Sequence, residues 1–351
     1  MFYFKRYILA LILSFSLAAC GGSGSNSTTD TAAPGGGNTN TGGNTGGNTG
    51  GNTGGNTGGS AASCTSVSSL CTSSGDTSVI AGATTDTTHF SGRTVTFYAP
   101  SNRGTSPALL ILMHGTGSTG ANVICESSAD LLAQAQGIVL AAPNARDSIG
   151  MANFDHYDGD GPGWDLTDNT STNADLQLVD SIITYARSTY NIDANRIHVL
   201  GHSNGAFFAE LVAFTNSNVA SFAENSGGNI PCANRGSCTF TGSGTSCSAL
   251  STSTPGGSMT WAQCNAACTS ADQPATPPSS RKPAAYIAHG AQDDIVSPYY
   301  SCSLSTALTA AGYTVSENIR SGSGGSPEGH SLPSAFACDT WSFLNAHQKG
   351  Q

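Results

Sequence analysis

The residues best suited to chemistry lie around Ser203, within the pentapeptide 201–205 (GHSNG). An apolar stretch typical of a strand, 196–200, precedes it, and one typical of a buried helix, 204–214, follows it. In this setting the glycines permit a turn too tight for side chains, and the serine hydroxyl is held exposed at its tip. The pattern predicts a nucleophile elbow, with Ser203 as the nucleophile of a covalent reaction.

A serine hydroxyl is a weak nucleophile at neutral pH, so it needs a histidine base and a carboxylate that orients the base. Hydrolases with a nucleophile elbow supply these groups in the chain order Ser, acid, His. Only His330 and His347 follow a plausible acid. His330 lies in a glycine-rich loop after a predicted strand at 313–319, whereas His347 lies in a polar tail. We therefore predict His330 as the base.

The acid is expected in the loop after the apolar run PAAYIA, at the carboxyl end of a predicted strand. That loop holds Asp293 and Asp294, and either could instead be a turn or helix-capping residue. His289 ends the strand and is expected to have a structural role. His114 and His202 also end predicted strands, where packing and turn geometry account for them better than catalysis does.

Attack on a carbonyl places negative charge on its oxygen, so two hydrogen-bond donors must face that position. The N–H of Asn204, directly after the nucleophile, is predicted as one donor. The second is expected from the turn 114–117 (HGTG), which follows the predicted strand 108–113. Within this turn Thr116 is the first choice for the donor, and Gly117 is the second.

The segment 154–165 (FDHYDGDGPGWD) combines aromatic, glycine and acidic residues. We predict that Trp164 and Tyr157 line a substrate cleft, with a plain packing role as the alternative for Trp164. The acidic residues also raise the possibility of calcium, but their spacing does not fit an EF-hand loop. No metal and no cofactor is predicted.

The amino terminus resembles an export signal. Two basic residues, Lys5 and Arg6, precede the apolar run 7–19, which is too short to span a bilayer as a stable helix. The run ends in LAAC, which resembles a bacterial lipobox with Cys20 as the lipid-modified residue; an ordinary signal peptide is the alternative. We therefore predict a signal peptide over 1–20 and an outer-membrane or cell-surface address.

Residues 21–62 are predicted to form a flexible linker, because 42–57 repeats Gly-Gly-Asn-Thr four times and the segment holds almost no apolar side chains. The catalytic domain is expected over 63–351. With only 10% charged residues and a net charge of −10, the chain is not expected to bind nucleic acid, and it should meet a membrane only through its lipid.

Ten of the eleven cysteines remain when Cys20 is set aside, an even number that suits up to five disulfides in an oxidising compartment. The connectivity is not deducible from the sequence. A zinc site is the competing interpretation, but no CxxC pair is present. Five of the ten cysteines lie in 226–282, a Ser-, Thr- and Gly-rich segment that we interpret as a disulfide-held insertion.

The folded region alternates apolar runs with helical periodicity, which predicts an α/β fold. Near-continuous apolar runs favour strands of a mostly parallel sheet with helices on both faces. These runs are 94–98, 108–113, 137–142, 196–200 and 283–288. A helix is predicted over 173–190, with Thr172 and Asp175 as a capping box.

Together these motifs resemble the secreted polyhydroxybutyrate depolymerase and feruloyl esterase group of α/β hydrolases. The resemblance covers roughly 91–343 and rests on LMHGTG, YNIDANRIHVLGHSNGA, HGAQDDIVSP and EGHS before Trp341. It implies the α/β-hydrolase fold and an acid four residues after the His of the HG pair, which is Asp293 here. The group commonly has a Cys where this chain has Thr116, a change that keeps the backbone donor.

The resemblance also implies hydrolysis of a carboxylic ester through an acyl-enzyme. The leading prediction is a lipid-anchored serine esterase that acts on an ester polymer or oligomer of the polyhydroxybutyrate type and works as a monomer. The alternative within the group is a feruloyl or acetylxylan esterase acting on plant polysaccharide. Outside the group, a serine peptidase on the same scaffold and a catalytically inactive surface-binding lipoprotein stay open.

Overall fold

A computed structural model describes ten stretches of the chain, all within one compact unit, Asn56–Gln351. They are residues 64–74, 77–146, 162–166, 169–228, 240–241, 246–251, 254–255, 276–293, 295–320 and 329–350. The predicted signal peptide, Cys20 and the linker lie outside the described residues. So do Tyr157, Asp294 and most of the predicted insertion.

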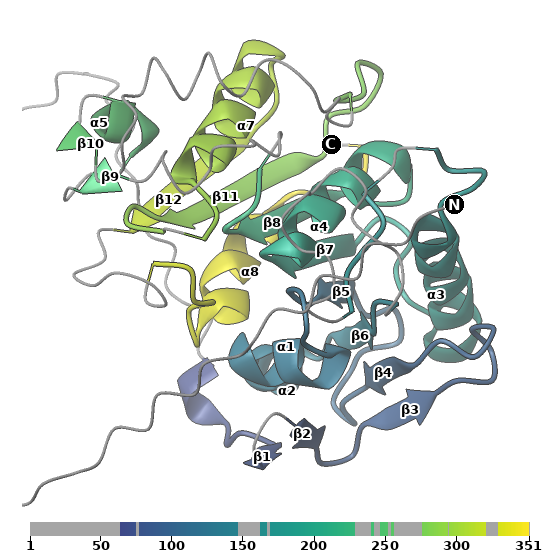
Figure 1. Ribbon diagram of the computed structural model, residues 1–351. Helices are drawn as coiled ribbons and strands as arrows, with labels where there is room; N and C mark the ends of the chain where they lie inside the picture. Colours follow the sequence, from purple (N-terminus) through teal and green to yellow (C-terminus); the bar gives the residue numbers. More distant parts are fainter. Residues whose placement is uncertain are drawn as a thin grey trace, which may run out of the picture. The chain divides into compact units, whose positions relative to one another are not determined.

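Eight strands of the described chain form one sheet, in the order β12-β11-β8-β7-β5-β6-β4-β3 (Figure 1). Their bounds are β3 Thr84–Asp86, β4 Val95–Tyr98, β5 Leu109–Met113, β6 Val139–Pro143, β7 Ile197–His202, β8 Ser221–Asn225, β11 Ala284–Gly290 and β12 Val315–Arg320. In this sheet β12, β11, β8, β7, β5 and β6 pair in parallel, while β4 and β3 add an antiparallel edge. The predicted mostly parallel α/β sheet is confirmed.

The order of the strands reverses between β5 and β7. From β5 the chain first adds β6 on one side and then returns to add β7, β8, β11 and β12 on the other. In doubly wound sheets the crevice at the carboxyl ends of the strands that flank such a reversal is where ligands bind. The turn after β5 and the turn after β7 therefore mark the place to look for a site.

Helices cover both faces of the sheet, because its central strands are apolar on both sides. In β5, Leu109 and Ile111 belong to one core cluster, and Leu110 and Leu112 belong to the other. The first cluster includes residues of α3 (Ala174–Tyr190), α4 (Asn204–Thr215) and α7 (Pro298–Ala310). The second includes residues of α1 (Gly120–Glu126), α2 (Ala129–Gln136) and α8 (Phe336–Ala346) (Figure 1).

The start of α3 differs from the predicted capping box. Its N-cap is Asn173, whose Oδ1 accepts hydrogen bonds from the N–H groups of Asp175 (2.9 Å) and Leu176 (3.1 Å). The Asp175 carboxylate is instead fully buried and accepts from the Arg93 guanidinium at 2.7 Å. The prediction of Thr172 as the cap is therefore wrong, because a neighbouring asparagine does the capping and the acid holds an internal ion pair.

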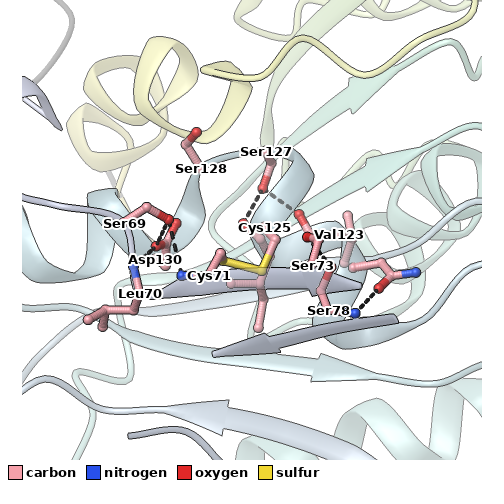
Figure 2. Close-up of a disulfide and its surroundings, with 12 residues drawn as sticks. Ser69, Leu70, Cys71, Ser73, Ser78, Val123, Cys125, Ser127, Ser128 and Asp130 are labelled. Carbon is pink, nitrogen blue, oxygen red and sulfur yellow. Dashed lines mark hydrogen bonds between the residues drawn. A yellow bond between two sulfur atoms is a disulfide. The ribbon is translucent and has the colours of Figure 1, made fainter. Parts of the chain in front are cut away.

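A small hairpin precedes the sheet. Its strands are β1 (Cys71–Ser74) and β2 (Thr77–Ile80), which follow the short helix η1 (Cys64–Ser66). Figure 2 shows how the disulfide between Cys71 and Cys125 ties this hairpin to α1. Another disulfide joins Cys64 to Cys338 of α8. No sequence pattern predicted these strands, which are short and mostly polar.

Part of the predicted insertion is described. Two short strands, β9 (Phe240–Thr241) and β10 (Thr254–Pro255), pair with each other, and the helix α5 (Cys247–Ser251) lies between them in the chain. A disulfide between Cys247 and Cys302 fastens α5 to α7. In the described residues, no helix is both long and apolar enough to cross a membrane.

Candidate active site

Ser203 occupies the tight turn between β7 and α4. Its backbone has φ 54° and ψ −125°, a conformation that a non-glycine residue adopts only when its surroundings enforce it. A Cβ on Gly201 would lie 2.0 Å from the Gly205 carbonyl oxygen, and one on Gly205 would lie 2.3 Å from the Met113 carbonyl oxygen. Both flanking glycines are therefore required, and the turn has the geometry of a nucleophile elbow.

The structure brings Ser203, His330 and Asp293 together from three distant parts of the chain. The Nε2 atom of His330 lies 2.9 Å from the Oγ atom of Ser203. Its Nδ1 atom lies 2.8 Å from Oδ2 of Asp293. Asp293 follows β11, and His330 lies ahead of α8. One imidazole thus joins a hydroxyl to a carboxylate at hydrogen-bonding distance on both sides.

The Asp293 carboxylate is fully buried and accepts several hydrogen bonds. Its Oδ1 accepts from the backbone N–H groups of Ile295 (3.0 Å) and Val296 (2.8 Å). Burial alone raises the pKa of Asp293, but hydrogen bonds and electrostatic attraction from His289 and His330 outweigh burial and lower that pKa well below its ordinary value. Asp293 therefore stays ionised at neutral pH.

A second histidine, His289, also contacts this carboxylate. Its Nε2 lies 2.8 Å from the Val296 carbonyl and 3.2 Å from Asp293 Oδ2. Because a carbonyl only accepts, Nε2 carries a proton. On the other side of the ring, Nδ1 lies 2.6 Å from the Ser301 hydroxyl, which lies 2.9 Å from Oε1 of Glu224. The predicted structural role of His289 is thus a specific one, next to the acid.

Glu224, on β8, and Ser301, on α7, had no sequence signal that linked them to this site. Both are fully buried. Burial raises the pKa of Glu224 to about 8, although its hydrogen bonds with Ser301 and Gly227 oppose this. Burial, and then repulsion from Glu224, also raises the pKa of Glu210 on α4. The protonated form of the Glu224 carboxyl is therefore favoured at pH 7.

The turn after β5 lies directly against the elbow. A Cβ on Gly115 would lie 3.2 Å from the Ser203 Cβ. The N–H of Gly117 donates to the Pro162 carbonyl at 3.0 Å, so it is already used. Within the described chain, no hydrogen bond uses the N–H of Thr116. Asn204 begins α4, and the N–H groups of a first helical turn point out of the helix end. Of the two alternatives in this turn, the geometry favours Thr116.

His114 and His202 have structural partners rather than access to Ser203. His114 is fully buried, and its Nε2 accepts from the Ala145 N–H at 2.9 Å. Desolvation lowers the pKa of His114 to about 4. Desolvation, and then the charge of His330, lowers the pKa of His202 to about 3. Both rings are therefore neutral at pH 7.

Trp164 does not line a cleft. Its side chain has no exposed surface, stacks on Phe208 with ring centroids 4.8 Å apart, and donates from Nε1 to the His114 carbonyl at 2.8 Å. Its N–H also donates to Oδ1 of Asn204 at 2.7 Å. The predicted substrate contact is therefore wrong, and the alternative of a packing role describes Trp164. Through these two hydrogen bonds, Trp164 links the turn after β5 to the start of α4.

Tyr157 and the acidic stretch considered for calcium lie outside the described residues. Among the residues that the structure does describe, no cluster of three or more His, Cys, Asp or Glu side chains could hold a metal ion.

Comparisons with known proteins find partial sequence matches to esterases. No protein-family model matches the chain. The chain is 29% identical over 140 residues to the bifunctional acetylxylan esterase/xylanase of Neocallimastix patriciarum, and 25% identical over 122 residues to feruloyl esterase B of Neurospora crassa. These matches cover 40% and 34% of this chain, and only 18% and 38% of the relatives' own lengths.

A solved structure shares the architecture. The complex of a cysteine variant of pOPH with DMSO matches 81% of this chain and 91% of its own, with a TM-score of 0.50 and 16% sequence identity. At this identity the likeness concerns the fold alone. With the strand order and the elbow, it confirms the predicted α/β-hydrolase fold.

Proposed function

We propose that this protein is a serine hydrolase of carboxylic esters. The observation that carries the proposal is the pair of hydrogen-bond distances at His330, 2.9 Å to Ser203 Oγ and 2.8 Å to Asp293 Oδ2. This arrangement activates a hydroxyl for attack on a carbonyl. The partial matches to an acetylxylan esterase and a feruloyl esterase support an ester, rather than a peptide, as the bond that is cleaved.

The reaction follows from these contacts. The Ser203 oxygen attacks the ester carbonyl while His330 Nε2 takes its proton, and Asp293 stabilises the imidazolium that forms. The N–H groups of Thr116 and Asn204 donate to the negative oxygen of the tetrahedral intermediate. His330 then gives its proton to the leaving alcohol, which leaves an acyl group on Ser203. In the second half, His330 takes a proton from water as the water attacks the acyl carbonyl. His330 then returns this proton to the Ser203 oxygen as the acyl bond breaks and the acid leaves.

Acetylxylan and feruloyl esters are the substrates that the matched relatives favour, since their names carry these esters. The motif resemblance to polyhydroxybutyrate depolymerases supports an aliphatic polyester as the second candidate. A substrate panel separates the two. Acetylated xylan, feruloylated xylan and polyhydroxybutyrate films are each incubated with the enzyme, and the released acids are quantified. Dominant release of 3-hydroxybutyrate would favour the polyester.

The nucleophile is tested by substitution and by covalent labelling. We expect Ser203→Ala to remove hydrolysis of p-nitrophenyl acetate, with a loss of about 10⁴-fold or more in kcat. A fluorophosphonate should label the native protein but not this variant. Ser188→Ala, on the exposed side of α3, is the matched control and should keep both activity and labelling. A native protein that resists the label would be an inactive binding protein, and dominant cleavage in a peptide panel would indicate a peptidase.

We also propose export with a lipid on Cys20. The LAAC sequence supports the lipid, and the three disulfides in the described residues are typical of an oxidising compartment. In a bacterial host, an alkyne-bearing fatty acid should be incorporated into the native chain and not into Cys20→Ser. Fractionation of the labelled protein then tests the outer-membrane address.

A further inference from the structure

A cleft opens beside the turn after β5, on the side of the amino-terminal hairpin. Its volume is about 490 Å³, within the range of about 300–1,000 Å³ typical of small-molecule sites. The hairpin, the turn after β5 and helix α1 form its walls. They supply Cys71, Ser73, Ser78, Thr116, Gly117, Ser118, Asn122, Cys125 and Glu126. Figure 2 shows the hairpin serines and the disulfide that form one side of it.

Polar side chains predominate among the residues that line this cleft. Six of its nine lining residues carry a hydroxyl, amide or carboxyl group, and the Cys71–Cys125 disulfide is also part of the lining. The described lining contains no aromatic and no large aliphatic side chain. A ligand with hydroxyl groups suits such a lining, because each hydroxyl both donates and accepts hydrogen bonds.

Glu126 adds an acceptor at the end of α1. Glu126 is an exposed residue that lines the cleft, and desolvation raises the pKa of its carboxyl. A carboxyl in this position accepts hydrogen bonds from sugar hydroxyls and, when protonated, also donates one.

The hairpin wall is held rigidly against α1. The disulfide joins β1 to the helix, and the N–H of Ser78 donates to Oδ1 of Asn122 at 2.9 Å. The hydroxyls of Ser73 and Ser78 lie 3.1 Å apart across the two strands. Just before β1, the Asp130 carboxylate accepts from the N–H of Leu70 at 2.8 Å (Figure 2). A wall fixed at this many points is preorganised for binding.

Three consecutive residues of the turn after β5 link the reacting centre to the cleft. Gly115 packs against the Ser203 Cβ, Thr116 follows it with the proposed oxyanion donor, and Thr116 and Gly117 line the cleft. An ester whose carbonyl oxygen lies at the Thr116 N–H therefore has one part of the molecule within reach of the hairpin.

We propose that this hairpin cleft is a subsite for the hydroxyl-bearing carbohydrate portion of the substrate. The proposal rests on the ester hydrolase function proposed above. A feruloyl ring would need apolar or aromatic walls, and a polyhydroxybutyrate chain offers no donors along its length to the acceptors of this cleft. A sugar ring offers both donors and acceptors all round.

Binding without turnover tests the subsite separately from catalysis. Full-length Ser203→Ala protein is titrated with unesterified xylohexaose and, in parallel, with a 3-hydroxybutyrate oligomer, by calorimetry or NMR. We expect xylohexaose to bind, and Ser203→Ala combined with Ser73→Phe or with Glu126→Gln to bind it about tenfold more weakly. Glu126→Gln keeps the shape of the side chain, so it remains informative if Ser73→Phe fails to fold.

Val79→Phe is the matched control, because Val79 lies on the same hairpin, is 62% exposed and does not line the cleft. In the active protein, Ser73→Phe should lower the ratio of kcat/KM for acetylated xylo-oligosaccharide to that for p-nitrophenyl acetate about tenfold, whereas Val79→Phe leaves both values unchanged. Three results would each overturn the subsite. Xylohexaose does not bind, or it binds equally well to the cleft variants, or only the polyester oligomer binds in a way that depends on the cleft. Failure of fluorophosphonate labelling would instead overturn the esterase function, so the two failures are distinguishable.

Discussion

His289, near the end of β11, and Asp293, four residues further on, contact each other inside the protein, with 3.2 Å between Nε2 and Oδ2. The same Oδ2 lies 2.8 Å from Nδ1 of His330. One carboxylate oxygen thus contacts two imidazoles, and the other oxygen accepts from two backbone N–H groups. The position of the acid is therefore fixed through both of its oxygens, and His289 is one of the groups that fix it.

His289→Phe should act through Asp293 rather than on the substrate. Removing the imidazole takes one partner from the buried Ser301 hydroxyl and one from the Asp293 carboxylate, and a shift of the acid disorients His330. We expect kcat for p-nitrophenyl acetate to fall about tenfold to a hundredfold, with KM little changed. His198→Phe is the control, since His198 is equally buried, lies 2.8 Å from Ser221 Oγ and stacks edge-on against Trp341. Equal losses of kcat in both variants, measured beside urea unfolding, would contradict a positioning role.

Thr116→Pro tests the oxyanion donor. Proline lacks the N–H that is predicted to face the developing charge, so we expect kcat to fall about 10²- to 10³-fold. Thr116→Ala keeps the N–H and should lose far less. Circular dichroism and thermal unfolding of both variants show whether the turn survives. If the proline variant folded and kept native kcat, the second donor would have to come from elsewhere.

Glu224→Gln should change how stability depends on pH. Burial raises the pKa of Glu224 from its ordinary value of 4.5 to about 8, so between these values the folded protein keeps a proton that the unfolded chain releases. Stability is therefore lost as pH rises through this window, by about 1.4 kcal/mol per pH unit for one such group. We expect the free energy of unfolding of Glu224→Gln, measured by urea relative to that of the native protein, to rise from pH 5 to pH 8. Above pH 8 the difference should stay constant. A difference between the two proteins that is independent of pH would refute this origin.

Trp164→Phe separates packing from substrate contact. The smaller ring keeps the stacking on Phe208 but loses the hydrogen bond from Nε1 to the His114 carbonyl. We expect a loss of about 1–3 kcal/mol in the free energy of unfolding, because a buried carbonyl loses its partner. The KM for acetylated xylan should stay within about twofold. A large rise in KM without loss of stability would restore Trp164 to the substrate site.

Local pattern was sufficient for the elbow. Ser203 could be predicted because two glycines and two apolar runs are adjacent in the sequence, and chain order then led to His330. The choice of Asp293 came from the resemblance, and the structure brings that residue to His330. These signals are short sequence motifs, so they can be recognised without knowledge of the three-dimensional structure.

Contacts between distant segments were not readable in this way. Glu224 and Ser301 are 77 positions apart and meet only because β8 and α7 pack together. Trp164 lies among polar and glycine residues typical of a surface, yet Phe208 of α4 covers it completely. The hairpin that borders the hairpin cleft has little apolar periodicity, since it is held by a disulfide and by single hydrogen bonds instead of a core.

Removal of the disulfide that holds this hairpin provides a final test, with an internal control of nearly equal loop length. Cys71 and Cys125 are 54 positions apart, and Cys247 and Cys302 are 55 apart. The chain-entropy model gives nearly the same stabilisation for each, about 4 kcal/mol. Replacing either pair by serine should therefore cost similar free energy of unfolding. Below both unfolding temperatures, only Cys71→Ser with Cys125→Ser should reduce kcat/KM for acetylated xylo-oligosaccharide relative to p-nitrophenyl acetate, because only that pair holds the wall of the cleft. A parallel loss of this ratio in the other double variant would show that general stability, and not the hairpin, governs it.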